Sequence, residues 1–225
     1  MHKPEISARL NPLQDLSGPV KAMASVSIDN VIAINSLTIV EGENGTFVGF
    51  PQSKDAKGNY RDIVEFLKDD EGKMTKESAE LKNAISTILI EMHSKNERQT
   101  PIIDKDPIMH EIKAFVTPLQ NPKTATKGLA TIQVGQLFKV NSIRVNESSK
   151  TQENFVAMPS RPDRSSDTGY RDVVHPVNKV FAEQLKGAVL KQYDSQIAWK
   201  NHTATKEQQP QQHEKPTTNK SQHSM

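Results

Sequence analysis

The sequence contains no cysteine among its 225 residues. That absence excludes disulfide bonds, thiolate zinc sites and cysteine nucleophiles, and it fits a reducing cytoplasm. The sequence also lacks an apolar run near the roughly 20 residues that a transmembrane helix requires. Its first residues lack the apolar stretch of a signal peptide. We therefore expect a cytoplasmic protein with no membrane partner.

Catalytic and ligand-binding motifs are missing as well. We find no glycine-rich phosphate loop, no cluster with metal-ligand spacing and no pair of catalytic carboxylates. His175 invites a catalytic interpretation, but no serine or carboxylate is spaced to form a triad with it, and an isolated histidine is usually structural. We expect a protein that is not an enzyme and that binds no cofactor and no metal.

Hydrophobic residues make up only 34% of the chain, which is low for one compact domain. The deficit is concentrated in residues 196–225, which are rich in Gln, Lys, Thr, Asn, His and Ser. Such a composition buries too little apolar surface to offset the entropy of an ordered chain. We predict a disordered polar tail over 196–225, whose scattered histidines face solvent rather than a metal.

The small net charge of +2 hides an uneven distribution. Residues 1–97 hold 11 Lys and Arg against 15 Asp and Glu, whereas residues 98–195 hold 14 against 10. An acidic first half joined to a basic second half favours attraction of a polyanion to the second half alone.

The sequence repeats itself at an offset of about 106 residues. Blocks recur in the same order, with small drifts in the offset that loop insertions would produce. The paired blocks are 6–13 with 112–119, 21–28 with 127–134, 35–37 with 141–143, 47–51 with 155–159, 60–64 with 170–174, and 81–85 with 185–189. Two copies are too few for a solenoid. We predict two packed domains, over 1–94 and 108–195, joined by a linker over 95–107.

Both copies have the same pattern of elements. Alternating apolar residues predict strands at 20–28 and 129–134, each followed by a two-residue turn. The turns are Asp29-Asn30 and Gly135-Gln136. Further strands are expected over 31–40, 46–50, 137–145 and 154–158, and each last strand leads into a polar loop. Each copy then ends on a helix with one apolar stripe: Leu81, Ile85, Ile88, Leu89 and Met92 in the first, and Phe181, Leu185, Ala188, Val189 and Tyr193 in the second. Asn178 is the expected N-cap of the second helix.

One long stretch of the second copy forms a recognisable signature. It consists of Phe155-Val-Ala-Met-Pro-Ser-Arg161, a variable loop, and Gly169-Tyr-Arg-Asp-Val-Val-His-Pro-Val-Asn178. This order strongly resembles the SpoVG family, the bacterial stage V sporulation or septation proteins, over about residues 108 to 195. The first copy resembles the family more weakly. It keeps Tyr60-Arg61-Asp62, but Glu65-Phe66 replaces His-Pro, and an insertion over 68–76 precedes its helix.

The resemblance implies an α+β fold, a small antiparallel sheet with a C-terminal helix, which pairs with a second copy through sheet edges. Because an edge strand carries unpaired backbone groups and a tethered partner has a high effective concentration, we expect an intramolecular pseudo-dimer. Members of the family are regulators that bind DNA, and in some cases RNA, and affect septation, sporulation, capsule formation and virulence genes. The resemblance therefore implies DNA or RNA as the partner.

The candidate residues for binding nucleic acid have basic side chains and belong mostly to the second copy. They are Arg161 and Arg164 in the loop, Arg171 after it, Lys179, Lys186 and Lys191 on the helix, and Lys54 and Lys57 in the weaker loop of the first copy. Arginine suits phosphate or guanine, because its guanidinium donates two parallel hydrogen bonds. The alternative for all of them is an ordinary solvated surface. We expect Asp62 and Asp172 to be structural.

A rival hypothesis is a non-catalytic interaction module that binds a division or sporulation protein and no nucleic acid. The nearly neutral total charge favours this rival, since many dedicated DNA-binding domains are more basic.

Overall fold

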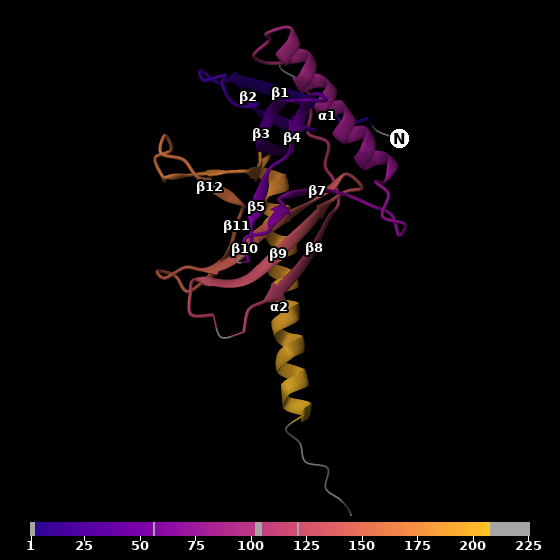
Figure 1. Ribbon diagram of the computed structural model, residues 1–225. Coiled ribbons are helices and arrows are strands. Elements are labelled where there is room, and N and C mark those ends of the chain that lie inside the picture. The colour runs from indigo at the N-terminus through magenta and orange to yellow at the C-terminus, as the bar shows by residue number, and fades with distance from the viewer. Residues whose placement is uncertain (1–2, 56, 102–104, 121, 208–225) are drawn as a thin grey trace, which may run out of the picture.

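The computed structural model describes residues 3–55, 57–101, 105–120 and 122–207, which form two five-stranded sheets with one helix on each and two small two-stranded sheets (Figure 1). The first copy contains β1 (Ile6–Pro12), β2 (Val20–Ile28), β3 (Ile32–Gly42), β4 (Gly45–Gly49), β5 (Gln52–Lys54), β6 (Tyr60–Asp62), β7 (Val64–Phe66) and α1 (Lys76–Ser94). The second contains β8 (Ile112–Pro118), β9 (Thr126–Val134), β10 (Phe138–Glu147), β11 (Asn154–Ala157), β12 (Ser160–Pro162), β13 (Tyr170–Asp172), β14 (Val174–Pro176) and α2 (Lys179–Glu207). The predicted α+β class with two tandem small domains is confirmed.

The predicted two-residue turns connect the long strands of each sheet. Asp29 and Asn30 both have a φ of 53°, and Gly135 has a φ of 52°. Positive φ at these positions matches the right-handed twist of the flanking strands, and Asn, Asp and Gly adopt it at least cost. The turns close β2 on β3 and β9 on β10 as antiparallel pairs.

The two copies exchange a short strand with each other. β7 of the first copy pairs with β10 of the second, with Val64 opposite Val140. β14 of the second copy pairs with β3 of the first, with Val174 opposite Ile34. The exchange is possible because β4 and β11 pair only with the C-terminal halves of β3 and β10 and leave the N-terminal halves open. The expected intramolecular pseudo-dimer is therefore built by reciprocal strand exchange.

Each helix packs on one face of its own copy's sheet, and the buried side chains of both copies form one continuous core. The predicted apolar stripes lie at this interface. Its fully or almost fully buried residues are Leu81, Ile85, Leu89 and Met92 of α1, and Phe181, Leu185, Val189 and Tyr193 of α2. A shared core means that neither copy can unfold without exposing apolar surface of the other.

A buried hydroxyl also joins the copies. Ser78 in the first turn of α1 is fully buried, and its hydroxyl donates to the carbonyl of Leu137 in the second copy. The same oxygen accepts a hydrogen bond of 2.9 Å from the backbone N–H of Leu67. Ser78 therefore satisfies buried backbone groups on both sides of the boundary.

Helix α2 begins as expected and ends later than expected. The Asn178 side chain accepts the backbone N–H of Phe181 at 3.0 Å, which confirms the predicted N-cap. The helix then continues to Glu207, into the segment where we expected a polar tail. Ile197 packs against the core, and the ammonium of Lys200 donates to the carbonyl of Pro118 at 3.0 Å. These contacts hold part of a polar segment on the sheet, and residues 208–225 lie outside the described residues.

The linker contributes to the first sheet. The backbone N–H of Leu10 on β1 donates to the carbonyl of Arg98 at 2.8 Å, and the N–H of Thr100 donates to the carbonyl of Ala8 at 3.0 Å. The chain after α1 thus covers the outer edge of β1. In the part of the chain described, no helix has the length and apolarity needed to span a membrane.

Candidate functional site

The polar loop that we expected after the short fourth strand of each copy is instead a hairpin. We call β5–β6 the first arm and β12–β13 the second arm (Figure 1). In the second arm, Arg161 lies opposite Arg171 and Pro162 opposite Tyr170. The backbone N–H of Asp163 donates to the carbonyl of Gly169 at 2.9 Å and closes the ladder at the tip. Gly169 has a φ of 72°, which a side chain would strain.

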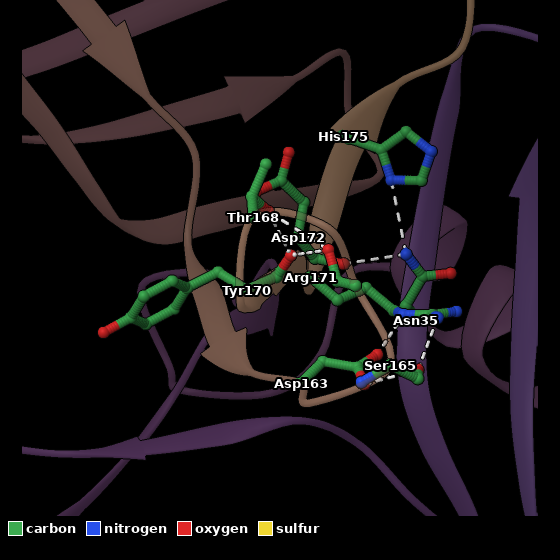
Figure 2. A network of polar contacts seen from close by, with 9 residues as sticks. Asn35, Asp163, Ser165, Thr168, Tyr170, Arg171, Asp172 and His175 are labelled. Atoms are coloured by element: carbon green, nitrogen blue, oxygen red, sulfur yellow. Dashed lines mark hydrogen bonds and ion pairs between the residues drawn. The ribbon is translucent and has the colours of Figure 1, made fainter.

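An aspartate at each tip binds the arginine on the returning strand. In the second arm the Arg171 guanidinium donates to the Asp163 carboxylate at 2.5 Å, and in the first arm Arg61 lies 3.3 Å from Asp55. Hydrogen bonds from the hydroxyl and N–H of Ser165, together with the Arg171 charge, lower the pKa of Asp163 (Figure 2). The arginine side chains remain 62% and 69% exposed. Arg171 and Arg61 therefore stiffen the arms and still reach solvent.

The base of each arm is held by an asparagine from the other copy. The Asn35 side chain on β3 donates to the main-chain carbonyl of Asp172 at 2.8 Å and lies 3.3 Å from Nδ1 of His175 (Figure 2). Its amide group is a donor, so Nδ1 is the acceptor in this contact. Burial raises the pKa of the Asp172 carboxyl, and the nearby His175 partly opposes that rise. We expected Asp172 to be structural. In this contact the main-chain carbonyl of Asp172, and not its carboxylate, accepts the hydrogen bond.

The counterpart in the first copy explains where the family signature changes. Asn141 donates to the carbonyl of Asp62 at 3.1 Å and to the carboxylate of Glu65 at 3.0 Å. Glu65 occupies the position that His175 occupies in the second copy, and both accept a hydrogen bond from asparagine. The change from His-Pro to Glu-Phe therefore preserves the junction between arm and sheet.

The structure groups the predicted arginines and separates them from the helix lysines. Arg161, Arg164 and Arg171 lie on the second arm, and Arg161 donates to the carbonyl of Gln52 on the first arm at 2.9 Å. Arg164 is exposed at the tip and has no polar partner among the described residues. The second arm also holds Asp163, Asp167 and Asp172, so its formal charge is balanced.

The remaining predicted lysines lie on other elements. Lys54 places its ammonium 5.0 Å from the ring centroid of Tyr60, and Lys57 is exposed near the tip of the first arm. Lys179 is exposed in the first turn of α2, Lys191 is exposed further along, and Lys186 forms an ion pair with Glu183 at 3.0 Å. Within the described ranges, no group of three or more His, Asp or Glu residues is placed to hold a metal ion.

Sequence reasoning missed the sheet face of the second copy that points away from α2. Two large apolar side chains, Phe115 on β8 and Leu129 on β9, are 52% and 50% exposed there. Their signal was present in the sequence, because both fall at the polar positions of alternating strands. Arg144 of β10 lies opposite Leu129 on the same face.

Comparison with known proteins agrees with the fold and the repeat. The model of the SpoVG family matches residues 5–85 and 109–195. A protein of Macrococcus caseolyticus named septation protein SpoVG is 38% identical over 68 residues, 30% of this chain and 56% of that protein. Proteins with this name from Agathobacter rectalis and Staphylococcus epidermidis are each 35% identical, over 71 and 85 residues. Those alignments cover 32% and 36% of this chain and 77% and 79% of the relatives.

The chain thus spans little more than half the length of the Macrococcus relative and over three quarters of the other two. The two matched segments correspond to the two strand-exchanged halves of the fold. The chain therefore belongs to the SpoVG family and carries its domain twice in tandem.

Proposed function

We propose that this protein acts in septation or sporulation, as the name of its relatives suggests, and that it does so as a regulator that binds DNA or RNA through its second copy. One observation carries the proposal. The second arm presents three arginines on a hairpin whose tip and base are both fixed by hydrogen bonds. Arg164 at its tip has no polar partner among the described residues.

Rigid presentation matters because each contact to a phosphate must overcome the entropy of ordering a long side chain. The Arg171 guanidinium already has a fixed orientation, and much of its surface remains open to a ligand. The aspartates of the arm cancel its formal charge, so long-range attraction must come from the surrounding surface. Residues 98–195 supply it with a net charge of +4.

The test is fluorescence anisotropy with labelled duplex DNA for the wild type, Arg164→Ala and the double variant Arg161→Ala/Arg164→Ala. We expect Arg164→Ala to weaken binding and the double variant to lose most affinity, with an unchanged urea midpoint. Loss of one phosphate contact reduces the salt dependence by about one unit of slope. Lys68→Ala, which removes an exposed cation of the first copy outside both arms, is the control. Equal affinity of all four proteins would refute the role of the second arm.

A second candidate function is binding of an extended peptide from a division or sporulation protein. The observation that favours it is the difference between the two sheet edges. The linker covers β1 at Ala8 and Leu10, whereas among the described residues no segment pairs with the corresponding positions of β8, Ala114 and Val116. An uncovered edge strand is a common docking place for a peptide strand.

Under this second hypothesis, Ala114→Pro would remove an outward backbone donor and abolish peptide binding. It would leave DNA binding intact, because Ala114 is remote in sequence and element from the second arm. The double arginine variant would show the opposite pattern. A peptide screen and the anisotropy assay on the same two proteins separate the hypotheses.

A further inference from the structure

The outer face of the second sheet contains a hollow of about 550 Å³. Its floor is formed by β8, β9 and β10, and one side is formed by β5 of the first copy. The volume falls within the roughly 300–1,000 Å³ that is typical of small-ligand sites. The strand exchange positions β5 here, so the hollow requires both copies.

Two exposed apolar side chains lie among polar ones on the floor of the hollow. Phe115 lies opposite Thr131, and Leu129 lies opposite Thr117, so the two apolar residues are diagonal neighbours on adjacent strands. Diagonal pairs are separated by about 7–8 Å, within reach of an aromatic ring. Both side chains are about half exposed. A flat ring in this position can stack on another planar group.

The walls of the hollow are basic. Arg144 on β10 lies opposite Leu129, and Lys54 comes from β5, where the neighbouring Ser53 hydroxyl lies 3.3 Å from the Ser142 hydroxyl on β10. None of the described residues that line the hollow is acidic. Next to Phe115 along β8, Lys113 begins a row that crosses Gln133, reaches Lys139 and ends at Glu65, and the Lys113 ammonium lies 3.8 Å from the Glu111 carboxylate. The lining of the hollow therefore combines a stacking platform with two cations, Arg144 and Lys54.

The first copy lacks this combination. At the repeat offset, Arg9 replaces Phe115, Met23 replaces Leu129 and Thr38 replaces Arg144. The hollow on that sheet is lined partly by the linker residues Gln99 to Pro101. The aromatic and basic surface is thus a property of the second copy.

We propose that this hollow binds an unpaired nucleotide of a single-stranded nucleic acid. The base stacks on Phe115 and packs against Leu129, while Arg144 and Lys54 hold the phosphate. Single strands fit because their base faces are accessible, whereas a duplex keeps them stacked inside. The inference rests on the proposed nucleic-acid binding. It adds a site that borders the second arm at Ser160 but contains none of its arginines, and it specifies an unpaired nucleotide as the ligand.

The experiment measures anisotropy with labelled oligothymidine, oligouridine and a duplex of equal length. Phe115→Ala should weaken binding of the single strands at least about fivefold, because loss of stacking on one aromatic residue lowers affinity by at least that factor. Phe115→Tyr should restore it, and Arg144→Ala should also reduce it. Duplex binding by Phe115→Ala should equal that of the wild type. Comparison of thymidine with uridine shows whether DNA or RNA is preferred.

Phe47→Ala is the matched control, because Phe47 is 53% exposed on the first sheet. It should leave binding of single strands unchanged, and urea unfolding of each variant verifies the fold. Wild-type affinity of both Phe115→Ala and Arg144→Ala for single strands would overturn this inference. That result would leave the proposed function intact, provided that the wild type binds the duplex and the double arginine variant does not. If the wild type bound none of the three nucleic acids, both this inference and the proposed function would be refuted.

Discussion

Replacement of Val174 by alanine should destabilise both copies, although Val174 belongs to the second one. Val174 is fully buried on β14 and lies opposite Ile34 in the first sheet. The substitution removes two buried carbon groups at about 0.8 kcal/mol each. The remaining cavity raises the cost to about 2 kcal/mol or somewhat more. Because the core is shared, this loss applies to unfolding of the whole molecule.

Hydrogen exchange read by mass spectrometry is the assay. A loss of about 2 kcal/mol accelerates exchange through global unfolding about 30-fold. We expect that acceleration in peptides from β1 and β2 as well as in peptides from β9 and α2. Val64→Ala on β7 should have the reciprocal effect, and Val180→Ala, which alters an exposed residue of α2, should change little. Unchanged protection of the first copy in Val174→Ala would refute the exchange of strands.

Further predictions concern single polar groups. Asn178→Ala should cost about 1 kcal/mol in urea unfolding, because the N–H of Phe181 loses its cap, whereas Asn178→Ser should retain most of the stability. Ser78→Ala should cost about 1–3 kcal/mol, because it leaves the N–H of Leu67 buried without a partner. The lowered pKa of Asp163 means that its carboxylate stabilises the second arm above the ordinary carboxyl range and that this support is lost as the pH falls through the lowered value. The amide signal of Ser165, whose N–H donates to the Asp163 carboxylate, should therefore stay unchanged in NMR spectra from pH 7 to pH 5 and move only below about pH 3.9.

Local signals in the sequence predicted local structure well. Asp29-Asn30 has the composition of a tight turn, the apolar stripe of Leu81 and Ile85 has helical spacing, and Asn178 has the chemistry of an N-cap. Each of these features depends on neighbours within a few residues, and the structure confirms all of them. The repeat added the relation between the copies, which no single segment contains.

The strand exchange and the arms could not be predicted in the same way. β7 and β14 are three residues long, too short to show a periodic pattern, and their partners are chosen by the open halves of β3 and β10. The arms are equally short and polar, so they were expected to be loops. Composition also led us to expect a shorter α2. The helix extends into the polar segment because one apolar residue there, Ile197, continues the contact with the core.

The candidate site was predicted in part. The sequence identified the basic residues of the second arm, but it did not show that Arg171 binds Asp163 or that Arg161 bridges the two arms. It also did not identify the hollow around Phe115, because alternation assigns apolar residues to the core and takes the other face as solvated. Only the sheet register shows Leu129 and Arg144 side by side on that face.

The most direct test of the account is the salt dependence of nucleic-acid binding by the unaltered protein. Anisotropy titrations with duplex and single-stranded DNA at several salt concentrations give the slope of log K against log salt. We predict binding at low salt that weakens steeply, with a slope of about −0.9 for each phosphate neutralised on the duplex and about −0.7 on the single strand. No binding of either nucleic acid at low salt would contradict the account and favour peptide binding at the edge of β8.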